Sequence, residues 1–113
     1  MGYKSILSSA SSEVFRTLAD PTRRALLERL IREGELTVQT LTLESGVSQP
    51  AVSKHLGVLK KAKLVVERRN GRQTHYRAQS EGLAPLLEWL EFYRSFWTER
   101  LDVLERVLED MNP

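Results

Sequence analysis

The residues of this chain that are best able to do chemistry are its lysines and arginines, and they are concentrated in one stretch. Residues 48–77 hold eight basic side chains against one acidic side chain, Glu67, for a net charge of +7. Residues 1–47 are neutral, and residues 78–113 carry three basic and eight acidic side chains, or −5. This asymmetry predicts that one surface meets a polyanion. The basic residues are Lys54, Lys60, Lys61, Lys63, Arg68, Arg69, Arg72 and Arg77.

Side chains typical of catalytic and metal centres are sparse. The chain has no cysteine, which excludes disulfides, thiolate zinc sites and cysteine nucleophiles and fits a cytoplasmic protein. Ser48 has no matching set of base and acid, and helix capping explains it. We assign His55 a structural or phosphate-contacting role, and His75 a place on the surface or in strand packing. We therefore expect no enzyme activity, no cofactor and no metal site.

The basic stretch begins with a pattern typical of a helix that follows a tight corner. Glycine in Ser45-Gly46-Val47 permits a left-handed turn, and Val47 is expected to plug the space between two helices. Ser48 caps the next helix, which runs to Lys61. The inward face of this helix is marked by apolar residues at spacings of four and three, namely Val52, Leu56 and Leu59.

The opposite face of the same helix is polar, basic and slim, and a helix of this kind can enter the major groove of DNA. Gln49 could pair with adenine, while Ser53 and Lys54 could reach base edges or phosphate. Pro50 and Ala51 are small apolar surfaces suited to a thymine methyl group. We predict that these five residues read the bases.

A basic hairpin follows the helix. Residues 64–69 and 73–77 are strand-like, and Asn70-Gly71 between them is a strong hairpin signal. A two-residue loop there would place Arg69 opposite Arg72, Val65 opposite Tyr76 and Val66 opposite His75. Gathering like charges at one turn costs stability, which suggests an external anion. The residues expected to contact phosphate or the minor groove are Ser48, His55, Lys60, Lys61, Arg68, Arg69 and Arg72.

Three shorter helices are expected upstream. The first runs from about Ser12 to Ala19, after an arm at residues 1–11. The second starts at Asp20-Pro21, a cap followed by proline at the first helical position, and ends at Gly34. Thr37 caps the third. The residues expected to be buried in the second and third helices are Ala25, Leu26, Leu27, Leu30, Ile31, Val38, Leu41 and Leu43.

Residues 82–111 predict one long helix, interrupted only by Pro85 in its first turn, where proline is tolerated. Its apolar surface is wider than one small domain can cover, so we expect burial against a second copy of the chain. Residues 1–113 then form a single, mainly α domain with a small β-hairpin wing, a winged helix-turn-helix with its DNA-binding core at 12–80. The expected interface residues on the long helix are Trp89, Phe92, Phe96, Trp97, Leu101, Leu104 and Leu108.

Three motifs together resemble the ArsR/SmtB family of bacterial repressors. FRTLADPTRRALL at residues 15–27 looks like the opening signature of the family, GVSQPAVSKHLGVL at 46–59 like its reading helix, and RNGRQTHYR at 69–77 like its wing. The resemblance implies a homodimer joined through the first helix, with Phe15 and Leu18, and the last helix. It further implies that the dimer binds an inverted-repeat operator in double-stranded DNA and leaves it when an effector binds.

The metal sites of the family do not carry over. Thr37 and Gln39 stand where arsenic- and cadmium-sensing members have cysteines, and the last helix has no histidine, which zinc- and nickel-sensing members use there. Whether a small organic effector binds in a pocket on the last helix stays open, and burial in a plain dimer core is the simpler interpretation. The rings that would line this pocket are Trp89, Phe92, Phe96 and Trp97.

Two other functions compete with a sequence-specific repressor. One is a constitutive or architectural DNA-binding protein that responds to no effector. The other is a protein–protein adaptor that uses the winged domain and the aromatic helix, against which the cationic hairpin argues.

Overall fold

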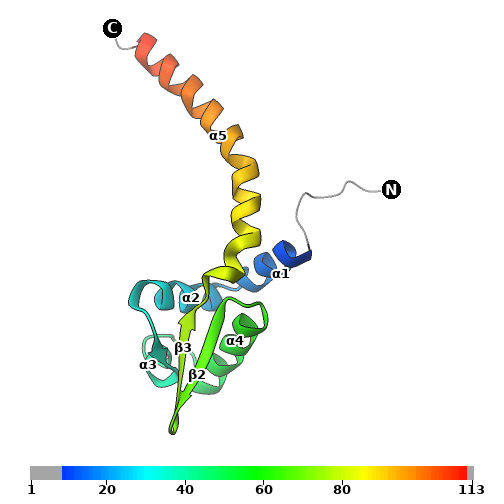
Figure 1. The fold of residues 1–113 in the computed structure, drawn as a ribbon. Helices are drawn as coiled ribbons and strands as arrows, with labels where there is room; N and C mark the ends of the chain where they lie inside the picture. Colours follow the sequence, from blue (N-terminus) through cyan, green and yellow to red (C-terminus); the bar gives the residue numbers. More distant parts are fainter. Residues whose placement is uncertain (1–8, 112–113) are drawn as a thin grey trace.

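The computed structural model describes residues 9–111 and has the expected class, mainly α-helical with a β-hairpin wing (Figure 1). Four helices and a small sheet form the body, and a long helix leaves it. The elements in chain order are α1 (Ser9–Leu18), α2 (Pro21–Glu33), β1 (Leu36–Thr37), α3 (Val38–Thr42), α4 (Gln49–Lys61), β2 (Val65–Asn70), β3 (Gln73–Ala78), the 3-10 helix η1 (Ser80–Leu83) and α5 (Ala84–Met111).

The first helix begins earlier than predicted. Residues 9–11 were expected in the arm but form the first turn of α1, while the rest of the arm, residues 1–8, lies outside the described residues. Tertiary contact explains the difference, because the buried Ser11 donates a hydrogen bond from Oγ to the carbonyl oxygen of Pro85 at 3.1 Å. This bond joins the start of α1 to the first turn of α5.

Helix α2 has the predicted ends. The amide of Arg23 donates to Asp20 Oδ1 at 3.0 Å, and Gly34 closes the helix with a φ of 85°. Donation from this amide lowers the pKa of the Asp20 carboxyl, and His55 contributes a smaller electrostatic effect. The apolar stripe is narrower than predicted, since Ala25 and Ile31 are exposed.

The helix-turn-helix unit, α3 and α4, is fixed by local capping and by one arginine. Thr37 caps α3 through the amide of Thr40, as predicted. Arg29 of α2 donates from Nη1 to the carbonyl oxygens of Thr40 and Leu43 at 3.0 and 3.1 Å, which satisfies backbone acceptors at the end of α3. Gly46 adopts the expected left-handed conformation, with a φ of 78°.

Two apolar residues of this corner are placed differently from the prediction. The side chains of Leu43 and Val47 are exposed rather than buried, so Val47 does not plug the turn. The buried space beside α3 is filled instead by Val38 and Leu41, and the turn after α3 carries the next residues outward.

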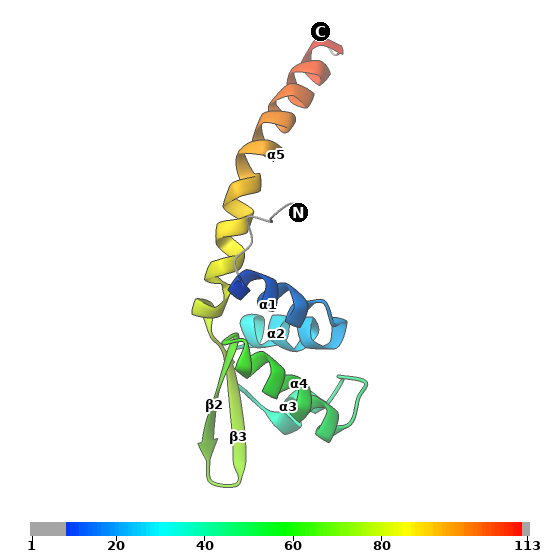
Figure 2. The same ribbon diagram turned by 90° about the vertical axis from the view of Figure 1, so that its right-hand side faces the viewer.

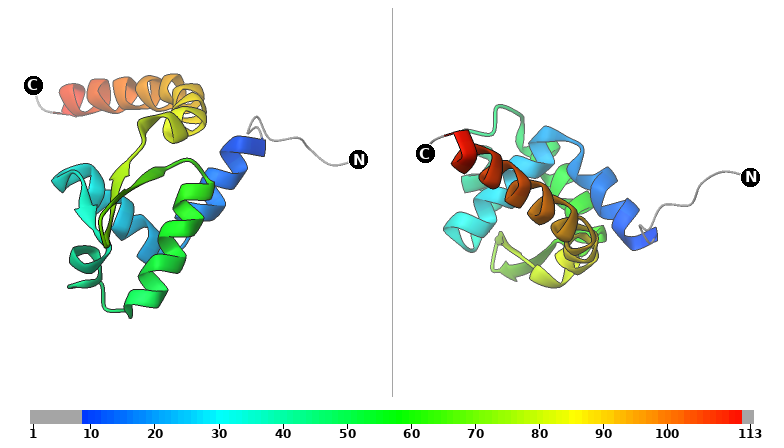
Figure 3. Two further views of the ribbon diagram at one scale, coloured as in Figure 1. Left: turned by 60° about the horizontal axis from the view of Figure 1, so that its bottom comes forward. Right: turned by 90° about the horizontal axis from the view of Figure 1, so that it is seen from above.

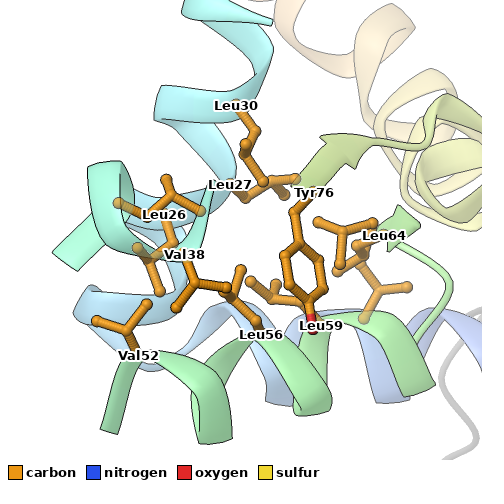
Figure 4. Packing of buried hydrophobic residues seen from close by; sticks show 12 residues of the cluster. Leu26, Leu27, Leu30, Val38, Val52, Leu56, Leu59, Leu64 and Tyr76 are labelled. Atoms are coloured by element: carbon orange, nitrogen blue, oxygen red, sulfur yellow. The ribbon is translucent and has the colours of Figure 1, made fainter. Parts of the chain in front are cut away.

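One core cluster packs against the inward side of α4 (Figure 4). Val52, Leu56 and Leu59 are fully buried, as their spacing predicted, and pack against side chains of α2, α3 and the sheet. The cluster fixes which side of α4 faces the protein. Its members are Val14, Leu26, Leu27, Leu30, Val38, Leu41, Val52, Leu56, Leu59, Leu64, Val65 and Tyr76.

The sheet has three antiparallel strands in the order β1-β3-β2, and sequence analysis missed β1, which has only two residues. The predicted hairpin register is wrong by two residues. Arg69 pairs with Thr74, Val65 with Ala78 and Val66 with Arg77, so the loop is Gly71-Arg72. The observed register separates Arg69 from Arg72, which removes the opposed like charges of the predicted one.

Helix α5 starts at Ala84, after a 3-10 turn, with Pro85 in its first turn. Figure 2 and the left view of Figure 3 show most of α5 lying away from the other helices. No residue of the helix is buried. The exposed apolar residues along it are Leu87, Leu90, Phe92, Phe96, Trp97, Leu101, Val103, Leu104, Val107, Leu108 and Met111.

Gly82 marks the closest backbone approach at the junction of η1 with the body. A Cβ atom on Gly82 would lie 2.1 Å from the carbonyl oxygen of Lys63. We expect Gly82→Ala to lower the free energy of unfolding by about 1–3 kcal/mol, because the backbone must move to relieve the overlap. The measurement is urea unfolding at fixed protein concentration.

Gly57 provides the matched control, since a Cβ atom there meets nothing within 4 Å. Gly57→Ala should leave stability unchanged or raise it by up to about 1 kcal/mol through helix propensity. If the Gly82→Ala protein unfolded at the wild-type urea concentration, the close approach would have no energetic consequence and the prediction would fail.

Candidate nucleic-acid interface

Four of the five predicted base-reading residues of α4 are exposed to solvent. Gln49, Pro50, Ser53 and Lys54 are exposed, and Ala51 is half-buried. Ser48 caps the helix by accepting a hydrogen bond from the amide of Ala51 at 3.3 Å. The helix therefore presents a polar, slightly basic surface whose first turn, free of large side chains, could approach base edges in a major groove.

The hairpin extends beside α3 and α4, at the end of the body opposite to α5 (Figure 2). Successive side chains of a strand point to opposite faces, so β2 divides its arginines. Arg69 lies on the same face as Glu67 and as Tyr76, which is the cross-strand partner of Glu67. Arg68 lies on the other face with its own cross-strand partner, His75. Arg72 lies in the loop at the tip. The hairpin thus presents cations in several directions.

Glu67 joins the hairpin to α4. Lys60, in the last turn of α4, donates from Nζ to Glu67 Oε1 at 2.6 Å, and the Tyr76 hydroxyl donates to Oε2 at 3.0 Å. These two hydrogen bonds hold the pKa of the Glu67 carboxyl below its ordinary value, and the bond from Lys60 has the larger effect. Burial, together with the bond to Glu67, raises the pKa of Tyr76 to about 12, so the phenol stays a donor at neutral pH.

The opposite face of the hairpin has a second carboxylate. Arg68 donates from Nε and Nη2 to the two oxygens of Glu35 at 3.1 and 2.8 Å, a bidentate ion pair that lowers the pKa of Glu35. His75 Nδ1 lies 4.0 Å from the same carboxylate, and within the described residues its buried Nε2 has no hydrogen-bond partner. His75 is a packed residue of the sheet, half-buried on the central strand β3.

The two carboxylates divide the predicted phosphate contacts into two groups. Lys60 and Arg68 already have partners in the protein. Lys61, Arg69 and Arg72 take part in no ion pair within residues 9–111, and neither does Lys54. His55 is half-buried near Asp20, and Ser48 uses its hydroxyl at the cap. The unpaired cations are therefore the ones best placed to meet an external anion.

The predicted interface residues on α1 and α5 are partly used within the chain. Leu18 packs against the core, and the Phe15 ring meets Trp89 edge to face, with 4.9 Å between centroids. Ring contacts continue along α5 from Trp89 through Tyr93 and Phe96 to Trp97. The other predicted residues stay exposed, namely Phe92, Phe96, Trp97, Leu101, Leu104 and Leu108.

An open hollow lies on α5 near the pocket expected from the sequence. Its lining includes three of the four rings named for an effector pocket, Trp89, Phe96 and Trp97, but Phe92 is not part of it. Phe92 instead packs its ring against Tyr93. The remaining lining residues are Leu90, Tyr93 and Arg94.

Sequence analysis missed the roles of Glu35 and Tyr76, and it treated Glu67 only as an exception to the charge pattern. The signal for Glu67 was present, because a single carboxylate among eight cations is surrounded by candidate partners. Glu35 gave no signal, since it lies 33 residues from Arg68 and meets it only through the strand β1 that was not predicted.

The two positions at which the resemblance places metal-binding cysteines hold side chains that do not bind metal in the way a thiolate does. Thr37 caps α3, and Gln39 is exposed. Among residues 9–111, no three histidine, aspartate or glutamate side chains gather in a way that could hold a metal ion. Within the same residues, no helix has the length and apolar character that crossing a membrane requires.

Comparisons with known proteins agree with this geometry. A family model described as a helix-turn-helix domain matches residues 18–68. The chain is 46% identical over 87 residues to the HTH-type transcriptional regulator Rv2034 of Mycobacterium tuberculosis, covering 77% of this chain and 78% of the relative. It is 30% identical over 79 residues to the transcriptional repressor SdpR of Bacillus subtilis, covering 70% and 87%.

Solved structures give the same result. The crystal structure of the ArsR family transcriptional regulator RHA00566 matches with a TM-score of 0.70 and 30% identity, covering 79% of this chain and 91% of that one. The homodimeric winged helix-turn-helix DNA-binding domain Mb0332 of Mycobacterium bovis matches with a TM-score of 0.62 and 27% identity, covering 84% and 91%. This chain therefore belongs to the ArsR family of winged helix-turn-helix transcriptional regulators, which are not enzymes.

Proposed function

We propose that the protein is a homodimeric repressor that binds an inverted-repeat operator in double-stranded DNA. The observation that carries this proposal is the exposed polar face of α4 beside a hairpin whose Arg69 and Arg72 have no ion-pair partner within the described residues. Gln49, Ser53 and Lys54, with Pro50 and Ala51, would read bases in the major groove, while the hairpin holds phosphate or enters the minor groove.

The proposed repressor is not metal-responsive through the usual sites of the family. Thr37 and Gln39 lack the thiolates of the arsenic-sensing site, and α5 has no histidine. The hollow on α5 is where a small organic effector would bind, and burial of the same rings in a dimer core stays the simpler interpretation. We place the protein in the cytoplasm, where a bacterial operator is found.

Selection of duplexes from a random pool, followed by titration at several salt concentrations, tests the function. The selected duplex should bind far more tightly than a scrambled duplex of the same composition. Equal affinity for the two would favour a constitutive or architectural DNA-binding protein. No binding to either would favour the protein–protein adaptor. Either result would contradict the proposal of a sequence-specific repressor.

Arg69 and Arg72 should contribute affinity without sequence preference. We expect Arg69→Ala and Arg72→Ala to weaken binding to selected and scrambled duplexes alike. Each phosphate that is no longer neutralised should reduce the slope of log K against log salt by about 0.9. Arg106→Ala, an exposed charge near the end of α5, is the matched control and should change neither. Unchanged slopes in the hairpin variants would remove these two arginines from the DNA-binding surface.

Gln49 should contribute sequence preference. Gln49→Ala is expected to cost about 1–3 kcal/mol of discrimination at one or two base pairs of each half-site, because alanine cannot form the bidentate hydrogen bonds to adenine. The measurement is affinity for the selected duplex and for its single-base variants. Weakening in equal proportion on every sequence would mean that Gln49 reads no base.

The exposed seam of α5 should be the dimer interface. Trp97, Leu101, Leu104 and Leu108 recur at spacings of four, three and four on one side of the helix, and Leu104 is 52% exposed in the single chain. We expect the wild type to sediment as a dimer of 13.0 kDa chains, and Leu104→Glu to shift it to the monomer, because a charge would enter the apolar seam. Glu99→Gln, on the polar side, should leave the dimer intact. A monomeric wild type at micromolar concentration would refute the interface.

A further inference from the structure

The hairpin is the part of the proposed DNA-binding surface with the fewest buried side chains beneath it. Beyond Val65 and Tyr76 its side chains are exposed or only half-buried, so little packing restrains residues 67–75. The body reaches this part of the hairpin through the pairing of Thr37 in β1 with His75 and through side chains on both faces of β2. Glu67 contacts Lys60 of α4 on one face, and Arg68 contacts Glu35 on the other.

The contact at Glu67 is directional because one of its donors is anchored in the core. The Tyr76 side chain is only 7% exposed, and its ring reaches toward α4 with the hydroxyl at the helix (Figure 4). Since Glu67 and Tyr76 are cross-strand partners, they lie on the same face of the sheet. A buried ring therefore fixes the position of the donor, and Lys60 fixes the second carboxylate oxygen from the end of α4.

We propose that Glu67 is a positioning residue, which sets the angle of the hairpin against the reading helix so that both meet DNA in one relative placement. The proposal rests on the proposed function for its consequence at DNA. Gly71 at the tip is the fourth residue after Glu67, a lever of about 13 Å, so a rotation of about 10° at Glu67 would move the tip by about 2 Å. Such a displacement is comparable with the precision that a groove contact requires.

The same carboxylate also limits the charge offered to DNA. While Lys60 is bound to Glu67, its ammonium group is not available to phosphate. An ion pair this exposed adds little to stability. Its effect on binding is larger, because each extra phosphate contact raises affinity on every sequence and so strengthens binding to DNA other than the operator.

Tyr76→Phe tests the positioning role without changing any charge. The ring stays in the core while the hydroxyl donor is removed. In the free protein we expect amides of residues 68–75 to exchange with solvent about five-fold faster, with those of α2 unchanged, which is the effect of removing one hydrogen bond on a local opening equilibrium. Tyr93→Phe removes a hydroxyl from α5 and is the matched control.

At DNA, the Tyr76→Phe protein should bind the duplex selected by the wild type up to about five-fold more weakly, because a smaller fraction holds the competent hairpin angle. Its affinity for a scrambled duplex and the salt slope of that binding should not change. A purely structural role would lower both affinities together.

Glu67→Gln is the second variant, and it also releases Lys60. We expect tighter binding to the scrambled duplex, a salt slope larger by about 0.9, and a smaller ratio of selected to scrambled affinity. A Glu67→Gln, Lys60→Gln double variant should lose the gain on scrambled DNA, which separates released lysine from general loss of negative charge.

If hairpin amides of the free Tyr76→Phe protein exchanged at the wild-type rate, the proposal would be overturned, regardless of the DNA-binding result. So would equal loss of affinity for both duplexes. If the wild type itself selected no duplex, the proposed function would fail, while the exchange measurement would still decide whether Glu67 holds the hairpin.

Discussion

The structure depends on burial of one face of α4. Val52, Leu56 and Leu59 are fully buried in a cluster shared with α2, α3 and the sheet. Because an α-helix has fixed periodicity, burying these three side chains leaves Lys54 on the opposite side and Ser53 on its flank, both facing solvent. Gln49 is exposed as well, at the first position of the helix. The core therefore does two things at once, since it stabilises the domain and orients the surface that would read DNA.

Some of the positive charge around this helix is already paired with carboxylates of the protein. The stretch of residues 48–77 carries a charge of +7, but Glu67 and Glu35 each bind one of its cations. Two carboxylates on opposite faces of β2 thus restrain a hairpin that has little core of its own. Arg69 and Arg72, which take part in no ion pair within residues 9–111, lie toward the tip, where contact with phosphate would not disturb the fold.

The second apolar surface of the molecule lies at the other end. Helix α5 leaves the body after Gly82, which packs directly against the backbone of Lys63, and it has no buried residue along its length. The family homologue from Mycobacterium bovis is homodimeric, and an apolar seam of this size gives a second chain a place to pack. DNA reading and pairing of chains would then use opposite ends of one small domain.

The sequence alone determined what depends on neighbouring residues. Caps at Asp20, Thr37 and Ser48, the left-handed turn at Gly46 and the spacing of buried residues in α4 are local signals, and all were predicted correctly.

Tertiary structure decided what depends on residues distant in the chain. The strand β1, the two-residue shift of the hairpin and the exposure of Ile31, Leu43 and Val47 all follow from how the elements pack. The pairing of Glu35 with Arg68 and the bonds of Glu67 to Lys60 and Tyr76 depend on that register. A slip of two residues keeps every side chain on its face, so hydrophobic alternation could not detect it.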